Sequence, residues 1–339
     1  MSKTKAGKKI GIIYGGLPDE RDYAVKSAND IEKALLTLGY KTVHIDFDKS
    51  ILSNLKKHKI DLAFLVDATF IGNKQEYALL GNKSLRDILE ENCIPYTASQ
   101  KIAADTTKNK VSSKKAFIKA HLKTPAYKEL TSDDSSKDEA RIIISELGLP
   151  IIVKPRDEGS SLGIVVTRTY DELIDAIETR KREFTHVFVE QYLKGTEVTV
   201  SLLEEDGQVK ALTIIEINHK SDYYSRAIKT TDFEMGNHGS AASEFHVPAR
   251  LNQDLYSLVQ KAAISAFKAV HASGYARVDI IISDGIPNIL EINALPVLHS
   301  KDFVSWSART CGIPYEQLIA KIVDTAWRNA DGKTRYGKR

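Results

Sequence analysis

Four polar residues at matching positions of two neighbouring predicted strands are the strongest chemical signal in the sequence. They are Arg277 and Asp279 on the first strand and Glu291 and Asn293 on the second. Directly opposed carboxylates destabilise a sheet unless a positive charge lies between them. An all-oxygen set of Asp, Glu and Asn side chains suits Mg²⁺, which takes a few carboxylates together with phosphate oxygens. The pattern therefore predicts a metal site beside an arginine.

The register of these strands follows from the turn that joins them. The strands Tyr275–Ser283 and Asn288–Asn293 flank a predicted three-residue loop, Asp284–Ile286, with glycine at its left-handed position. Such a loop places Asp279 opposite Glu291, and the arginine opposite the asparagine, on one face of the hairpin. An exposed polar face with a slipped register is the competing interpretation, but an apolar rear face opposes slippage. The predicted rear face consists of Ile280, Ile282, Leu290 and Ile292.

A loop rich in glycine and serine, Glu158–Gly163, follows the predicted strand Ile151–Lys154. Glycines let the backbone approach phosphate oxygens, and consecutive N–H groups with the hydroxyls of Ser160 and Ser161 could cradle them. The loop is neither a P-loop nor a dinucleotide-binding turn, because a strand follows it and Gly-Lys-Ser/Thr is absent. An ordinary turn is the alternative. A buried Lys154 at the strand end favours phosphate, since such a charge requires an anionic partner.

Three further carboxylates lie at the ends of predicted elements. The apolar strand Val187–Val189 ends in Glu190, and Glu197 begins the next strand. At such a junction the two side chains could accept hydrogen bonds from ribose hydroxyls, although solvated charges at strand ends are the competing interpretation. Glu20 follows a Gly15-Gly16 turn at the carboxyl end of the first strand, where open α/β sheets bind ligands; a purely structural turn is the alternative.

The elements that must position these residues change in character along the chain. The first third alternates the strands Lys9–Tyr14, Val43–Phe47 and Asp61–Val66 with helical periodicity, for example over Ala24–Leu38. Alternation of this kind implies right-handed crossovers and a parallel sheet. Antiparallel pairing is expected later, where Asp206-Gly207 is a hairpin signal.

Residues 218–248 show no clear periodicity and exceed ordinary loop lengths, which favours a lid or substrate loop. A disordered excursion is the alternative.

Composition excludes several classes of protein. The 339 residues contain 48 Lys and Arg against 45 Asp and Glu, and this near-balance argues against a chain built to coat nucleic acid. The two cysteines exclude a disulfide framework and a cysteine-rich zinc site. No apolar run approaches the roughly 20 residues of a membrane span, and the N-terminus lacks a secretory pattern. We therefore expect a cytoplasmic protein without membrane or nucleic-acid partners.

Taken together and in order, the motifs resemble the D-alanine–D-alanine ligase family of the ATP-grasp superfamily. The resemblance runs from about Lys9 to Val323. It is carried by Ile152–Pro155, Glu158–Gly163, Val189–Leu193, Glu197–Val200, Ala276–Asp279 and Glu291–Asn293, with Pro95–Ser99 and Phe245–Ala249 as further similar segments. It implies a fold of mixed α/β and α+β class, in which two α+β lobes clasp ATP beside an open parallel α/β domain. The expected division is 8–104 for the α/β domain, 105–193 for the central lobe and 194–330 for the C-terminal lobe with the long loop.

The resemblance also implies roles for individual residues. For the nucleotide these are Lys110 and Lys154 at the phosphates, with Ser160 in the glycine-rich loop, Glu190 and Gln191 at the adenine, Leu193 along the pocket and Glu197 at the ribose. For catalysis they are Arg277 at the tetrahedral intermediate, Glu20 at the ammonium group of the first amino acid, Ser161 supporting it, and Arg226 in the long loop. Asp279, Glu291 and Asn293 would ligate two Mg²⁺ ions, with Mn²⁺ as an alternative metal.

The amino-acid half of the site departs from the family pattern. Val297 replaces the glycine of a Pro-Gly-Met turn, which limits close backbone approach. Asp302 falls where a serine would bind the carboxylate of the second substrate, and Ser300 could substitute if the alignment shifts. Arg226 replaces a lysine in the long loop, keeping the charge but not the geometry, and Lys229 is another candidate. The His-Gly and Gly-Glu-Asp-Gly motifs of the first domain are also missing.

We therefore expect an ADP-forming ligase that joins an amino acid or related carboxylate to an amine through an acyl-phosphate. Asp302 in the second pocket favours a cationic amine lacking a carboxylate. A D-alanine–D-alanine ligase of peptidoglycan precursor synthesis is the first alternative, and an inactive nucleotide-binding scaffold is the second. Small-molecule substrates and a homodimer complete the expectation.

Overall fold

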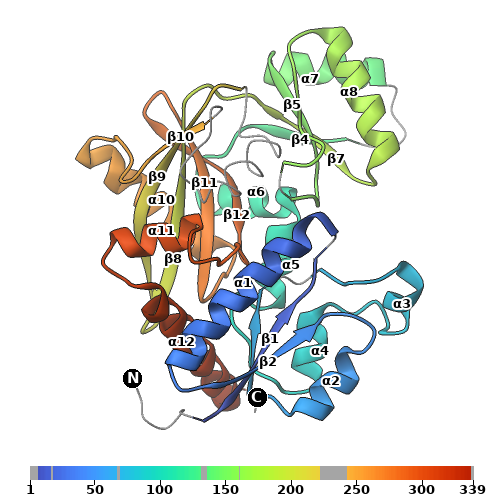
Figure 1. The fold of residues 1–339 in the computed structure, drawn as a ribbon. Coiled ribbons are helices and arrows are strands. Elements are labelled where there is room, and N and C mark those ends of the chain that lie inside the picture. Colours follow the sequence, from blue (N-terminus) through green and yellow to red (C-terminus); the bar gives the residue numbers. More distant parts are fainter. Residues whose placement is uncertain are drawn as a thin grey trace.

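The computed structural model describes residues 7–16, 18–66, 69–130, 136–159, 161–221 and 243–336. Within them the chain forms three sheets, each from a separate stretch of the sequence (Figure 1). The first sheet is parallel and the other two are antiparallel. The mixed class predicted from the sequence is thereby confirmed. None of the described helices is both long and apolar enough to cross a lipid bilayer.

The first sheet has the order β2-β1-β3, with bounds Lys41–Asp46, Lys9–Tyr14 and Leu62–Leu65. Its strands alternate with helices, as the periodicity predicts, and every residue of β3 is buried. The accompanying helices are α1 (Pro18–Thr37), α2 (Ile51–His58), α3 (Lys74–Ala78) and α4 (Leu85–Glu91). Apolar strands covered by amphipathic helices explain this arrangement.

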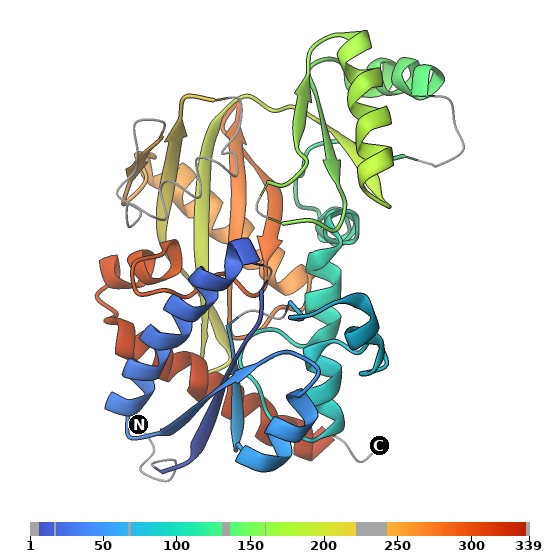
Figure 2. The ribbon, with the colours of Figure 1, turned by 45° about the vertical axis from the view of Figure 1, so that its right-hand side comes forward.

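The second sheet is short and lies at the far end of the molecule from the first (Figure 2). Its order is β4-β7-β5-β6, with bounds Tyr127–Glu129, Val187–Gln191, Ile151–Pro155 and Val165–Thr167. Helices α7 (Ser136–Leu147) and α8 (Tyr170–Glu183) pack against it through a cluster that includes Ile143, Ile151, Leu173 and Ile177.

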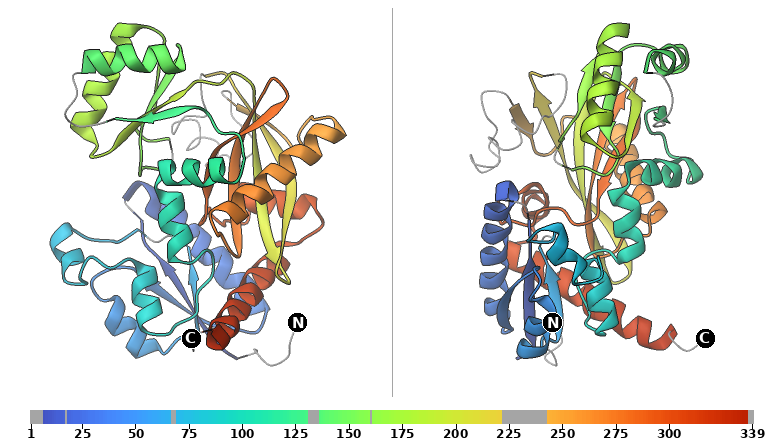
Figure 3. Two further views of the ribbon diagram at one scale, coloured as in Figure 1. Left: turned by 180° about the vertical axis from the view of Figure 1, so that it is seen from behind. Right: turned by 90° about the vertical axis from the view of Figure 1, so that its right-hand side faces the viewer.

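The third sheet has the order β10-β9-β8-β11-β12. The bounds are Ser243–His246, Gln208–His219, Thr196–Glu205, Tyr275–Ser283 and Ile286–Asn293. Helix α10 (Gln253–Ala269) crosses its rear face, where Val198, Val278 and Phe267 belong to one buried cluster (Figure 3). The sheet therefore has an apolar rear face and a polar front face.

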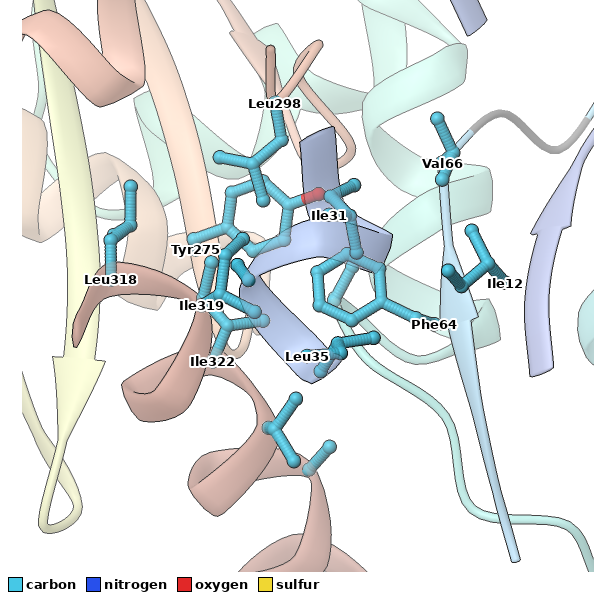
Figure 4. Packing of buried hydrophobic residues seen from close by; sticks show 14 of the residues in the cluster. Ile12, Ile31, Leu35, Phe64, Val66, Tyr275, Leu298, Leu318, Ile319 and Ile322 are labelled. Atoms are coloured by element: carbon cyan, nitrogen blue, oxygen red, sulfur yellow. The ribbon is translucent and has the colours of Figure 1, made fainter. Parts of the chain in front are cut away.

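The remaining helices join the sheets. Helix α5 (Lys101–Lys108) leads into α6 (Lys110–Lys119). Near the C-terminus, α11 (Phe303–Thr310) precedes α12 (Tyr315–Tyr336). Helix α12 returns to the first sheet, and Ile319 and Ile322 share a buried cluster with Leu35 of α1 and Tyr275 of β11 (Figure 4). The first and third sheets thus share one core.

The β11–β12 hairpin has the predicted register but not the predicted turn. Asp279 lies opposite Glu291, which confirms the prediction, while Ser283 pairs with Ile286, so the loop has two residues, Asp284 and Gly285. Both have positive φ, as a two-residue hairpin turn of type I′ requires.

A β-bulge restores the register. Ile280 pairs with Ile289 and Asp279 with Glu291, so Leu290 is an extra residue on β12. The predicted rear face is therefore wrong at this position: Ile289 is buried in the core, and Leu290 lines the cavity described below.

The link between the second and third sheets makes a close backbone contact at Gly195. A Cβ atom at this position would lie 2.0 Å from the carbonyl oxygen of Ile282 on β11. The backbone fixes the position of a Cβ atom, and the Ile282 carbonyl oxygen is itself part of the backbone, so neither atom can rotate away. A larger residue at position 195 would therefore have to displace the chain. Glycine is therefore required where β8 begins.

We predict that Gly195→Ala lowers the free energy of unfolding by about 1–3 kcal/mol, measured by urea denaturation. Gly159→Ala is the matched control, because a Cβ there meets nothing within 4 Å and its backbone is not left-handed. The control should change stability by less than about 0.5 kcal/mol. Equal effects of the two substitutions would contradict the assignment.

Candidate active site

A cavity of about 400 Å³ lies where the second and third sheets meet. Its wall includes residues of β5 and β7 from the second sheet and of β8, β9, β11 and β12 from the third. The loop 192–195, which connects the two sheets, and part of the glycine-rich loop also line the cavity, as does Lys110 of α6. A ligand of this volume would therefore contact both sheets at once.

Most of the predicted site residues come together here. The cavity is lined by Lys110, Lys154, Ser161, Glu190, Gln191, Leu193, Glu197, Asp279 and Glu291. Arg277 and Asn293 form the next pair along the β11–β12 hairpin, on the same face as Asp279 and Glu291. Ser160, Arg226 and Lys229, together with the side chain of Glu20, lie outside the described residues.

A buried charge cluster borders the cavity, which Lys154 and Glu190 both line. The Glu190 side chain is 1% exposed and lies between two lysines. Lys114 Nζ is 2.8 Å from Glu190 Oε2, and Lys154 Nζ contacts Oε1. Lys114 also donates to Thr124 Oγ1 at 2.8 Å. Two cations share one carboxylate, so the cluster keeps a surplus positive charge that an anionic ligand would neutralise.

The ionisation of this cluster reflects competing effects. Burial lowers the pKa of Lys114 to about 8, although the neighbouring Glu190 carboxylate opposes the shift. Burial also opposes ionisation of Glu190, but Lys114 and Lys154 outweigh it and hold the pKa of that carboxyl below its usual value. Glu190 is thus a carboxylate held ionised by its partners.

Sequence reasoning gave Lys114 no role, although a signal was present. Lys110 and Lys114 are four residues apart in the sequence, a spacing that places two side chains on one face of a helix. In the structure Lys110 lies in the first turn of α6, which Asn109 caps by accepting a hydrogen bond from Ser112 N at 2.9 Å. The Lys110 side chain contacts the Glu158 carbonyl and lies 3.5 Å from Glu291 Oε2. It therefore bridges the glycine-rich loop and β12.

The polar front face of the third sheet holds Asp279 in place. Arg277 donates from Nε and Nη2 to its two carboxylate oxygens, both at 2.9 Å, and Thr199 Oγ1 donates at 2.7 Å. Burial lowers the pKa of Arg277, but Asp279 outweighs that effect and the net pKa is raised. The positive charge that opposed carboxylates need is therefore supplied partly from the same strand.

The donor set at this face fits a hard divalent cation. Asp279 and Glu291 are opposite residues of adjacent strands, and Asn293 follows two positions later on the same face. Among the described residues no group of three His, Cys, Asp or Glu side chains is arranged to hold a metal. An ion here would therefore need the asparagine amide and oxygens of a bound ligand besides the two carboxylates, as Mg²⁺ sites commonly use.

The structure gives Asp302 a capping role. Its side chain accepts hydrogen bonds from Ser305 N at 3.0 Å and His299 N at 2.7 Å, at the start of α11. Burial raises the pKa of Asp302 to about 7, although backbone N–H groups oppose the shift. Neither Asp302 nor Ser300 lines the cavity, and Ser300 N donates to Asp30 Oδ2 at 3.2 Å.

Comparison with known proteins gives consistent matches. Residues 116–324 match a family model described as the D-ala D-ala ligase C-terminus. A D-alanine–D-alanine ligase of Geotalea uraniireducens is 35% identical over 320 residues, which cover 94% of this chain and 96% of that protein. One from Bacillus anthracis is 32% identical over 321 residues, covering 94% and 97%.

Solved structures agree with the sequence matches. The D-alanine–D-alanine ligase of Bacillus anthracis complexed with ATP has a TM-score of 0.77 at 29% identity, covering 96% of this chain and all of that one. The VanG D-Ala:D-Ser ligase of Enterococcus faecalis has a TM-score of 0.75 at 22% identity, covering 94% and 99%. At that identity the likeness concerns the fold alone.

We predict that Glu190→Gln lowers the free energy of unfolding by roughly 3–5 kcal/mol, because it leaves two lysines buried without a carboxylate. Urea denaturation measures the change. Glu129→Gln is the matched control: Glu129 pairs at 2.8 Å with Lys115, the neighbour of Lys114, but this pair is exposed. The control should cost less than about 1 kcal/mol. Similar losses of unfolding free energy in both variants would show that the buried cluster stabilises the fold no more than an exposed ion pair does.

Proposed function

Because the chain belongs to the D-alanine–D-alanine ligase family of ATP-grasp enzymes, and is thus an ATP-dependent carbon–nitrogen ligase, we propose that its cavity binds ATP and activates a carboxylate for amide formation. One observation carries the proposal: a surplus of buried lysine charge faces an oxygen-rich strand pair across a cavity of about 400 Å³. Phosphates need such a cationic end, and their metal ions need such oxygens.

The nucleotide would lie along the wall of the second sheet. In this assignment Lys110 and Lys154 neutralise the phosphates, with Ser160 in the glycine-rich loop beside them. Glu190 and Gln191 would meet the adenine side, Leu193 would line its pocket and Glu197 would meet the ribose. Asp279, Glu291 and Asn293 would hold two Mg²⁺ ions, with Mn²⁺ as an alternative, and the ions would neutralise charge on the phosphates.

The reaction would proceed in two steps. A carboxylate oxygen of the first substrate attacks the γ-phosphorus, the bond from that phosphorus to the ADP oxygen breaks, and an acyl-phosphate forms. The amine of the second substrate then attacks the acyl carbon, its proton is lost and phosphate leaves. Arg277 would stabilise the oxyanion of the tetrahedral intermediate. Glu20 would hold the ammonium group of the first amino acid, with Ser161 supporting it and Arg226 or Lys229 reaching in from the long loop.

One feature of the second-substrate region supports a nucleophile other than D-alanine. Val297 occupies a position where a glycine would let the backbone approach an oxyanion. Asp302 adds no structural support, because its carboxyl caps α11 and does not line the cavity. A cationic amine without a carboxylate is the second substrate that we propose from the sequence. The D-alanine–D-alanine ligase alternative is favoured by the 35% identity to such an enzyme over nearly the whole chain.

A homodimer in the cytoplasm is also proposed. The support for self-association is a set of exposed apolar side chains on adjoining helices, including Ile102 on α5 and Ile118 on α6. Such side chains favour burial against a partner.

The decisive experiment measures ADP release with ATP, Mg²⁺ and a panel of amino acids and amines. We expect turnover when an amino acid is paired with an amine that lacks a carboxylate, and weak turnover with D-alanine alone. Robust turnover with D-alanine alone would restore the alternative. Binding of ATP without ADP release for any pair would favour the nucleotide-binding scaffold.

The metal assignment predicts that Glu291→Gln lowers ADP release by about 100-fold or more while the protein stays folded, because one metal ligand loses its charge. Circular dichroism checks folding. Glu244→Gln, an exposed position on β10 of the same sheet, is the control and should leave ADP release unchanged. Unchanged turnover in Glu291→Gln would exclude the assignment.

A further inference from the structure

A histidine with two hydrogen bonds lies at the end of β9, on the wall of the cavity. His219 Nε2 is 2.8 Å from Glu197 Oε2, and His219 Nδ1 is 2.8 Å from the carbonyl oxygen of Ser221. The three residues all line the cavity. The His219 and Glu197 side chains are mostly buried, at 12% and 18% exposure.

These contacts determine the protonation of the ring. A backbone carbonyl only accepts hydrogen bonds, and so does an ionised carboxylate. Both ring nitrogens of His219 must therefore donate, which makes the ring an imidazolium. His299 differs: its Nδ1 accepts from Lys301 N at 3.2 Å while Nε2 faces Asp30, so a neutral ring satisfies both contacts. His219 is thus a cation placed against Glu197.

Strand pairing fixes the geometry of the pair. Glu197 on β8 lies opposite Ile217 on β9, so His219, two residues further along, projects from the same face. The bond to Ser221 orients the ring at one nitrogen, and the other nitrogen then holds Glu197 Oε2. Within the described part of the chain, the second carboxylate oxygen, Oε1, has no hydrogen-bond partner and can accept from a ligand in the cavity.

We propose that His219 is a positioning residue, which fixes Glu197 as an ionised acceptor for a hydroxyl group of the nucleotide sugar. The inference deepens the proposed function and rests on it. An ionised carboxylate accepts hydrogen bonds and therefore recognises hydroxyl groups, which donate them. Such charge-assisted hydrogen bonds are stronger than those between neutral groups. Without the imidazolium, the carboxylate would lose both its orientation and its neutralising partner.

Two substitutions separate the two ring nitrogens. His219→Gln places an amide N–H near the position of Nε2 and can still donate to Glu197. His219→Asn places its amide near Nδ1 and reaches only Ser221. A merely structural role would make the two variants alike, whereas positioning of Glu197 makes the glutamine variant a rescue.

The test measures binding of ATP, 2′-deoxy-ATP and 3′-deoxy-ATP by calorimetry in the presence of Mg²⁺, together with kcat and KM for ATP. The unsubstituted protein should bind ATP about tenfold more tightly than the analogue that lacks the contacted hydroxyl. His219→Asn should raise KM for ATP by about tenfold with kcat nearly unchanged, and should abolish that discrimination. His219→Gln should keep a KM for ATP close to that of the unsubstituted protein and most of the discrimination between ATP and the deoxy analogue.

Glu197→Gln serves as a second variant if His219→Asn fails to fold. It should lose the same discrimination, and adding His219→Gln to it should cause no further loss. Equal behaviour of the asparagine and glutamine variants, or ATP discrimination that survives in His219→Asn and Glu197→Gln, would overturn the inference.

The calorimetric measurement of ATP binding needs no amino acid. The ligase proposal and the proposed role of His219 can therefore fail separately. If no substrate pair releases ADP, the ligase proposal fails while sugar recognition is still measured. If ADP is released but the variants keep their discrimination, only the role of His219 is excluded. Failure of the unsubstituted protein to bind ATP would overturn both.

Discussion

The arrangement of the cavity depends on one buried interaction, the contact of Glu190 with Lys114 and Lys154. Its members come from three elements: Lys114 from α6, Glu190 from β7 and Lys154 from β5. Helix α6 is itself anchored to the third sheet, because Phe117 belongs to the buried cluster beneath that sheet. The cluster therefore joins the second sheet to a helix that packs against the third, beside the cavity.

This contact imposes a condition on whatever enters the cavity. Removing ionised groups from water is costly, and a single carboxylate cannot compensate two ammonium groups. An anion that approaches Lys154 completes the compensation. In this way the interaction that holds the two sheets together also selects for a negatively charged ligand, and the opposite wall, with Asp279 and Glu291, suits the cations that accompany such a ligand. The charges of Glu190, Lys114 and Lys154 therefore contribute both to stability and to ligand binding.

Sequence patterns predicted those features that depend on alternation and missed those that depend on contacts between distant segments. The opposition of Asp279 and Glu291 was predicted correctly because the bulge on β12 offsets the turn, which is one residue shorter than the predicted one. The bulge at Leu290 was not, because Ile289 and Leu290 are both apolar and either could face the core. The position of Glu190 between two lysines, and that of His219 beside Glu197, required strands that meet only in the folded chain. The charge of Asp302 suggested a role in substrate selection, whereas in the structure its side chain caps α11 by accepting hydrogen bonds from two backbone N–H groups.

The bulge on β12 has a consequence for how this binding surface can change over time. Leu290 pairs with no residue of β11, so its presence alters neither the turn nor the partners of the residues on either side. A lineage could gain or lose this apolar side chain of the cavity wall by inserting or deleting a single codon, while Asp279 and Glu291 stay opposite each other. Ligand preference at this wall can therefore change when the bulge of β12 gains or loses one residue. An insertion or deletion elsewhere in the strand would instead change the pairing with β11.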